Sequence, residues 1–149
     1  MGSTHSSLHY HLVFSTRKRE SWFEADFRPP LFAYLGGVVR GLKGVPHAVG
    51  GVADHVHLLV GLRPAHCLSD FMRDLKADSS KWIKGKLQRK AFGWQSGYGA
   101  FSVGAPDLEK VRQYVLSQEE HHRKLSFEDE YLAFLRRGLV EYDERYLWG

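Results

Sequence analysis

The chain contains a single cysteine, Cys67, so it cannot form an internal disulfide. It also lacks long apolar runs: no stretch approaches the roughly 18 apolar residues of a membrane-spanning helix, and no signal peptide is recognisable. These absences favour a cytoplasmic protein. The 149 residues are 43% hydrophobic, enough for the core of a single domain over residues 1–149. The polar start, residues 1–7, is expected to be disordered.

Positive charge is concentrated in the middle of the sequence. The net charge is only +4, but residues 63–90 hold eight Lys and Arg residues against three Asp, whereas residues 107–149 hold seven against ten acidic residues. A basic segment of this kind favours a polyanionic partner, most commonly nucleic acid. On this clue alone, a solvated helix face is an equally good interpretation.

The order of the apolar patterns predicts an α+β fold. Strands are expected at residues 9–15, 45–52, 55–62 and 98–103. Helices are expected at residues 29–42, at 70–87 with Ser69 as N-cap, at 108–122 and at 127–137. The β-α-β-β-α-β order predicts a ferredoxin-like, RRM-like sandwich: a four-stranded antiparallel sheet with two helices on one face and appended C-terminal helices. The other face or edge then needs cover, which a second copy of the chain would supply in a homodimer.

Two histidines, His55 and His57, lie two residues apart in the apolar run of residues 52–62. Alternate residues of a strand share a face, so both imidazoles are expected to point the same way. Neutral imidazoles bind divalent transition metals, so this pair is half of a metal site. The spacing alone is a weak signal, because His9 and His11 repeat it. We favour His55 and His57 because they lie within the apolar run, whereas His9 adjoins the N-terminal segment.

Tyr114 and Gln118 form a second candidate group. They lie four residues apart on an expected helix, so a phenol and an amide oxygen can approach the same point. The same spacing also fits the edge of a core stripe. A phenol with a pKa of about 10 is a poor nucleophile at neutral pH unless a metal or a general base assists it. A metal at the histidine pair would provide that assistance.

Three segments in order resemble a known family: DHVHLLV at 54–60, FGWQSGYGAFSVG at 92–104 and VRQYVLSQEEHH at 111–122. They resemble the single-tyrosine HUH transposases of small bacterial insertion sequences, where HUH denotes histidine, hydrophobic residue, histidine. The resemblance runs from about Tyr10 to Trp148. It implies an enzyme that cleaves and rejoins single-stranded DNA at hairpin-bearing element ends through a 5′-phosphotyrosine intermediate. By position, Tyr114 would be the nucleophile, and the ligands of Mg²⁺ or Mn²⁺ would be His55, His57 and Gln118.

The resemblance also implies DNA contacts and an assembly. DNA hairpins would bind the basic helix and a cluster after the first strand, through Arg17, Lys18, Arg19, Arg73, Lys76, Lys81, Lys84 and Lys86. A homodimer is implied, with the tyrosine helix placed in cis or in trans. Trp94 and Tyr98 fit either base stacking or the core. His121 and His122 are expected to be helix-end or DNA-contacting residues rather than metal ligands.

Three alternatives remain. A domesticated relative would bind or nick repeated hairpins without mobility, and it stays open because mobility depends on the flanking DNA. An RRM-like nucleic-acid-binding module is a weaker interpretation, because the expected strands lack an RNP-like aromatic run and His55 and His57 would have no role. A metal-dependent hydrolase without a covalent intermediate would survive loss of Tyr114.

Overall fold

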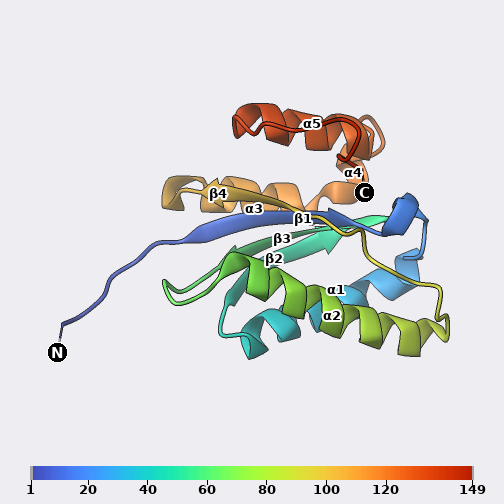
Figure 1. Ribbon diagram of the computed structural model, residues 1–149, viewed down its shortest axis with the longest axis horizontal. Helices are drawn as coiled ribbons and strands as arrows, with labels where there is room; N and C mark the ends of the chain where they lie inside the picture. Colours follow the sequence, from blue (N-terminus) through green and yellow to red (C-terminus); the bar gives the residue numbers. More distant parts are fainter. Residues whose placement is uncertain (1, 149) are drawn as a thin grey trace.

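A computed structural model of the chain describes residues 2–148 (Figure 1). Residues 2–7 form no helix or strand and extend away from the body of the molecule. Met1, which belongs to the segment expected to be disordered, lies outside the described residues. No helix within residues 2–148 is both long and apolar enough to cross a membrane.

Four strands form one antiparallel sheet in the order β2-β3-β1-β4. They are β1 (His9–Ser15), β2 (Val45–Gly51), β3 (His55–Gly61) and β4 (Gly99–Val103), and their ends differ by one residue at most from those expected. Helix α1 (Arg28–Gly41) connects β1 to β2, and helix α2 (Leu68–Leu87) connects β3 to β4. The predicted ferredoxin-like order is thereby confirmed.

Helices α1 and α2 cover one face of the sheet (Figure 1). Leu12 and Phe14 of β1, and Val56 and Leu58 of β3, are fully buried in the main core on this side. Because alternate residues of a strand point to opposite faces, the odd-numbered residues of β3 point to the other side. This alternation is what places the histidine pair away from the main core.

Helix α2 begins two residues earlier than expected. Cys67, not Ser69, occupies the N-cap position, and Ser69 lies in the first turn with its hydroxyl 3.3 Å from Cys67 Sγ. Leu68 packs against the main core, which explains why the helix extends to include it.

The other face of the sheet is covered by the chain's own C-terminal helices, α3 (Leu108–Leu116), α4 (Gln118–His121) and α5 (Phe127–Arg137) (Figure 1). Leu59 packs against Val115 of α3, and Val13 packs against Tyr131 of α5. The cover that we expected from a second copy is therefore supplied on this face by the chain itself. An uncovered face no longer argues for dimerisation, and the homodimer stays a prediction.

The helix expected over residues 108–122 is broken at Ser117, which has φ −110° and ψ 30°. The Ser117 hydroxyl donates a hydrogen bond to the carbonyl of Gln113, a side-chain bond that competes with the helical ladder. The break separates Tyr114, on α3, from Gln118, on α4. The two residues are therefore not successive turns of one regular helix, although both remain on the covered face.

Helix α3 approaches strand β2 most closely at Gly50. A Cβ built on Gly50 would lie 2.0 Å from the carbonyl oxygen of Val115, a backbone atom that cannot turn away. Gly50 thus sets how close α3 lies to the sheet. Because Val115 is adjacent to Tyr114, the same contact fixes the position of the tyrosine.

We predict that Gly50→Ala lowers the free energy of unfolding by about 1–3 kcal/mol, because the added methyl group forces α3 away from β2. Chemical denaturation measures the change. Gly37→Ala is the matched control, since a Cβ on this helical glycine meets nothing within 4 Å, and helix propensity should make it neutral or stabilising. Equal stability of Gly50→Ala and wild type would contradict the close packing of α3.

Candidate metal and tyrosine site

The two histidines of β3 point toward the C-terminal helices, as the strand alternation predicts. His55 and His57 are both fully buried. Each ring presents its Nε2 atom to the space between β3 and helix α5, where it meets groups from other elements.

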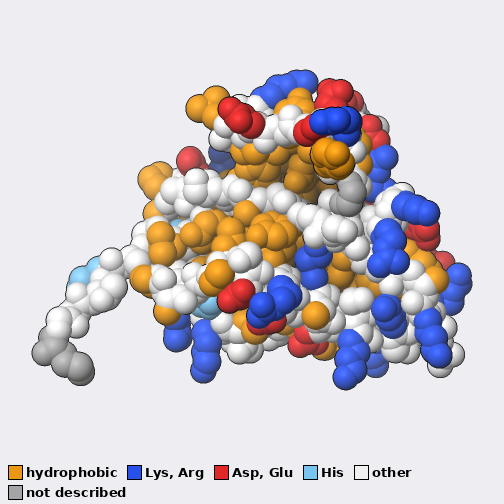
Figure 2. Space-filling view, in the orientation of Figure 1, with side chains coloured by type: hydrophobic (Ala, Val, Ile, Leu, Met, Phe, Trp, Pro, Cys, Tyr) orange, Lys and Arg blue, Asp and Glu red, His pale blue; other side chains and the backbone are white. Residues whose placement is uncertain are grey.

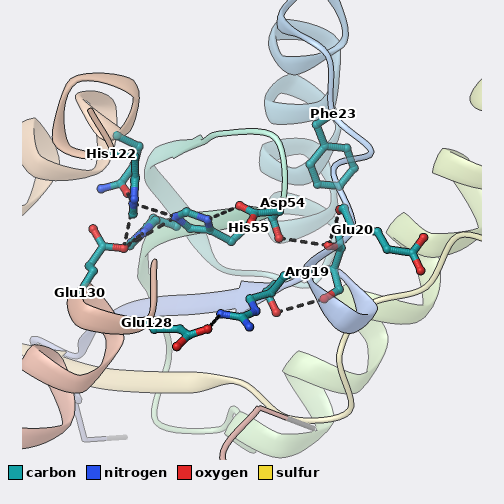
Figure 3. A network of polar contacts seen from close by, with 12 residues as sticks. Arg19, Glu20, Phe23, Asp54, His55, His122, Glu128 and Glu130 are labelled. Atoms are coloured by element: carbon teal, nitrogen blue, oxygen red, sulfur yellow. Dashed lines mark hydrogen bonds and ion pairs between the residues drawn. The ribbon is translucent and has the colours of Figure 1, made fainter. Parts of the chain in front are cut away.

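Two residues of the C-terminal segment join this pair. His122 follows α4, and Glu130 lies on α5 with only 2% of its surface exposed. One ligand atom from each of His55, His57, His122 and Glu130 lies within 4.8 Å of all the others. His55 Nε2 is 3.0 Å from His122 Nε2, and Glu130 Oε1 is 3.0 Å from His57 Nε2 and 3.2 Å from His122 Nε2 (Figure 3). His122, expected to be a helix-end or DNA-contacting residue rather than a metal ligand, thus lies within this cluster.

Two further contacts, made by the Nδ1 atoms, orient the rings of His55 and His57. His55 Nδ1 is 2.8 Å from Asp54 Oδ1, so the proton of this ring belongs on Nδ1 and its Nε2 lone pair faces the cluster (Figure 3). His57 Nδ1 is 2.8 Å from His11 Nε2. His11 is the second histidine of the pair that the sequence disfavoured, yet strand β1 carries it next to β3 and only 3% of its surface is exposed.

Tyr114 reaches the same cluster from α3. Its hydroxyl donates a hydrogen bond to Glu130 Oε2, so a single carboxylate separates the phenol from the histidines. Its ring stacks on His121 with centroids 4.4 Å apart. One chain therefore holds the tyrosine and both histidines of the candidate site.

Gln118 is buried at the edge of the cluster, with 1% of its surface exposed. Its Oε1 lies 3.1 Å from His122 Nε2, and its Nε2 donates to the carbonyl of Tyr114 at 3.1 Å. The contact of Gln118 with the cluster thus runs through His122, while its amide also holds the Tyr114 backbone.

The charges of the cluster follow from burial and hydrogen bonding. Burial alone would raise the pKa of Glu130, but hydrogen bonds from His122 and His57 outweigh it and hold the pKa well below its usual value. Burial raises the pKa of Tyr114, and its hydrogen bond to anionic Glu130 raises the pKa further. Burial lowers the pKa of His57 to about 4, so this ring is neutral at pH 7, the form that binds metals.

Solvent reaches Tyr114 through a cleft between α3, β4 and α5. The cleft is lined by Tyr114 itself, by His121, and by two cationic residues, Lys110 and Arg137, against one acidic residue, Asp107. A phosphate group approaching the phenol from this side would therefore meet positive charge.

The expected DNA-contacting residues fall into two groups. Five are exposed and belong to no ion pair within residues 2–148, namely Arg17, Lys18, Lys81, Lys84 and Lys86. The other three have partners within the chain. Arg19 pairs with Glu128 and Arg73 pairs with Asp70 and Asp74, while Lys76 donates to the carbonyls of Gln95, Ser96 and Gly97.

The two aromatic candidates also differ in their surroundings. Trp94 is buried in the main core, and its Nε1 donates to Ser79 Oγ at 3.0 Å, so it packs rather than stacks on bases. Tyr98 is only partly buried. The aromatic pair on the surface is instead Trp82 and Tyr34, whose rings stack with centroids 4.4 Å apart.

We predict that acid destabilises the fold through its buried histidines. Burial lowers the pKa of His11 to about 3 and that of His57 to about 4, whereas an unfolded histidine has a pKa of about 6.5. Between these values the unfolded chain binds more protons than the folded chain, so stability falls as the pH falls. The melting temperature should drop from pH 6.5 to pH 4.5.

His11→Gln should reduce this drop, because one of the two buried rings is removed while the amide can still donate to His57. Thermal unfolding followed by circular dichroism provides the measurement. His5→Gln, at an exposed position, is the control and should behave as wild type. The same pH dependence in all three proteins would show that the buried rings do not cause the effect.

The comparisons with known proteins agree on one family. A family model described as "Transposase IS200 like" matches residues 4–118. The ISDra2 transposase TnpA of Deinococcus radiodurans is 26% identical over 121 residues, which cover 76% of this chain and 85% of that protein. The transposase of insertion sequence element IS200 from Salmonella typhimurium is 28% identical over 134 residues, which cover 83% and 84%.

Two solved structures share the fold. A proposed transposase from Deinococcus radiodurans matches with a TM-score of 0.63 and 22% identity, covering 77% of this chain and 95% of that chain. A REP-associated tyrosine transposase bound to a REP hairpin matches with a TM-score of 0.54 and 16% identity, covering 77% and 70%. The family match includes His55, His57 and Tyr114 and ends at Gln118, so His122 and Glu130 lie beyond it. The chain belongs to the IS200-like transposase family.

Proposed function

We propose that this protein is a metal-dependent transposase that cleaves and rejoins single-stranded DNA at hairpin-bearing element ends through a 5′-phosphotyrosine intermediate. One observation carries the proposal: the Tyr114 hydroxyl donates a hydrogen bond to Glu130, which belongs to the buried cluster of histidines and a carboxylate. Membership of the IS200-like family supports the same reaction class.

The residues present fit a divalent cation. His55 and His57 offer imidazole nitrogens, and buried oxygen donors lie beside them. A mixed nitrogen and oxygen set suits Mn²⁺ at least as well as Mg²⁺, which prefers oxygen. By position in the family, Gln118 would be the third protein ligand. When bound, the cation would act as a Lewis acid on the scissile phosphate.

Tyr114 is the proposed nucleophile. Its phenol oxygen would attack the phosphorus, forming a tyrosine O–P bond while the bond from phosphorus to the 3′ oxygen breaks. Glu130 orients the phenol through its hydrogen bond, the proton of the phenol leaves to solvent, and the departing 3′ oxygen takes a proton from solvent. The products are a 5′-phosphotyrosine and a free 3′ hydroxyl, and reversal with a new 3′ hydroxyl rejoins the strand.

DNA hairpins are the proposed partner of a basic ridge, defined as Arg17, Lys18, Lys81, Lys84 and Lys86. Figure 2 shows Lys and Arg side chains gathered over α2 and beyond its end. The two halves of the ridge meet because Arg17 N donates to the carbonyl of Gly93, shortly after α2, at 2.8 Å. Phosphate contacts along this ridge would set the affinity for a hairpin.

The ridge also reaches toward the site. Thr16, directly before Arg17, donates its backbone N–H to the carbonyl of Asp54 at 2.8 Å, and Asp54 precedes His55. Tyr34 of α1 and Trp82 of α2 stack on each other and offer a flat aromatic surface for an unpaired base of the hairpin. A hairpin held on the ridge would thus have its flanking single strand close to the start of β3.

We predict a covalent adduct that depends on Tyr114. Wild-type protein incubated with Mn²⁺ and single-stranded DNA from the flanks of its own gene should form an SDS-resistant protein–DNA adduct on a denaturing gel. Tyr114→Phe should form none but should still bind the hairpin, because the phosphate contacts lie on the basic ridge. Tyr142→Phe, at an exposed position of the tail, is the control and should react as wild type.

An adduct formed by Tyr114→Phe would refute the assignment of the nucleophile. Hairpin binding by wild type with no adduct on a cleavable substrate would refute the transposase reaction. That second result would favour a domesticated, hairpin-binding relative.

We predict that the basic ridge determines the salt dependence of hairpin binding. Replacing Lys81, Lys84 and Lys86 together by Gln should weaken binding and lower the slope of log affinity against log salt by about 2, since each phosphate contact contributes about 0.7–0.9. Fluorescence anisotropy at several salt concentrations measures the slope. Arg73→Gln is the matched control, because Arg73 already pairs with two aspartates. Equal changes in both variants would contradict the placement of the DNA.

A further inference from the structure

We propose that Glu130 supplies the oxygen ligand of the divalent cation and His122 a third imidazole, so that strand β3 and the C-terminal segment build the metal site together. This inference rests on the proposed function, because it takes metal-dependent chemistry at this site as given. It assigns ligands beyond the family match, and in this arrangement Gln118, the third ligand by position in the family, positions His122 instead.

The first argument is the number of protons among the buried groups. Asp54 holds the proton of His55 on Nδ1, which leaves His55 Nε2 as a lone pair. His122 Nε2 therefore faces three acceptors at 3.0–3.2 Å, namely His55 Nε2, Gln118 Oε1 and Glu130 Oε1. One N–H cannot satisfy three acceptors. The space between these four atoms is therefore surrounded by more lone pairs than protons, an arrangement that suits a cation.

The second argument is the spacing of the donor atoms. Ligands bound at about 2.0–2.1 Å to one ion lie about 2.8–3.4 Å apart in octahedral or tetrahedral arrangements. Glu130 Oε1 lies 3.0 Å from His57 Nε2, 3.2 Å from His122 Nε2 and 3.6 Å from His55 Nε2. Glu130 therefore approaches all three rings. The side-chain oxygen of Gln118, Oε1, lies 3.1 Å from His122 Nε2.

The third argument is charge. Glu130 is a buried carboxylate, and its ion-pair partners among residues 2–148 are all histidines. A buried anion is costly unless a cation compensates it, and a divalent cation would do so directly. A carboxylate is also a better ligand than an amide for Mn²⁺ or Mg²⁺, because it is anionic.

The packing of α5 explains how Glu130 is held in place. Glu130 lies in the buried stripe of α5 between Phe127 and Tyr131. Glu128, two residues earlier, pairs with Arg19, which anchors the start of α5 beside the turn after β1 (Figure 3). The second oxygen of Glu130 accepts the Tyr114 hydroxyl. One side chain can therefore bind the cation through Oε1 and hold the nucleophile through Oε2.

The test is Mn²⁺ binding by the intact protein without DNA, measured from the free Mn²⁺ signal in electron paramagnetic resonance. Glu130→Gln should weaken binding by at least about tenfold, since loss of even an outer partner of a metal ligand has an effect of this size. Gln118→Ala should weaken it less. Asp129→Asn, at an exposed position of the same helix, is the matched control and should change affinity less than about twofold.

His55→Ala separates this inference from the proposed function. If His55→Ala loses Mn²⁺ but Glu130→Gln retains wild-type affinity, the metal site stands and the assignment of Glu130 is wrong. A larger loss in Gln118→Ala than in Glu130→Gln also overturns it. If wild type itself binds no Mn²⁺, the proposed metal-dependent function fails, and the inference fails with it.

A second measurement does not depend on the folding of Glu130→Gln. Pulsed paramagnetic resonance of Mn²⁺ bound to wild type should detect nitrogen coupling from three imidazoles, and His122→Asn should remove one of them. Coupling from only two imidazoles in wild type would overturn the role of His122.

Discussion

The carboxylate of Glu130 is the interaction on which the rest of the site depends. Its Oε1 contacts His57 and His122, and its Oε2 accepts the Tyr114 hydroxyl. It therefore connects strand β3, the segment after α4 and helix α3 through one side chain of α5. Without it, the tyrosine and the histidines would be neighbours on one face of the sheet, but the phenol would lose the carboxylate that links it to His57 and His122.

The packing of strands and helices brings Tyr114 and the histidines to the same side of the sheet. Alternation along β3 sends Val56 and Leu58 into the main core and the two histidines to the other face. Gly50 lets α3 approach the sheet, which brings Tyr114 close to the cluster that contains the histidine rings. The arrangement thus depends on a small residue of β2 as much as on the polar residues themselves.

Local patterns were sufficient to predict much of this structure. The strands and the direction of His55 and His57 follow from the period of two, and α5 was placed at residues 127–137 from its helical period alone. The break at Ser117 was missed, because it depends on a side-chain hydrogen bond to Gln113 rather than on the apolar pattern. The cover of the second face was missed, because it depends on how the C-terminal helices fold back.

His122 and Glu130 were missed because they join the site only through tertiary packing. One signal in the sequence does point to Glu130: a carboxylate lies in the apolar stripe of an amphipathic helix, between Phe127 and Tyr131, where it needs a buried partner. Its position after Glu128 and Asp129 hides that signal, since acidic residues are common in the first turn of a helix. The count of basic residues also misled at Lys76. This residue was expected to contact DNA, but its ammonium group donates hydrogen bonds to three backbone carbonyls.

The most direct test of this account is an anomalous diffraction experiment on crystals of the intact protein grown with Mn²⁺. The account predicts one strong peak within bonding distance of Nε2 of His55, His57 and His122 and of Oε1 of Glu130. A peak bonded by His55, His57 and Gln118 with Glu130 turned away, or no peak at the cluster, would contradict it.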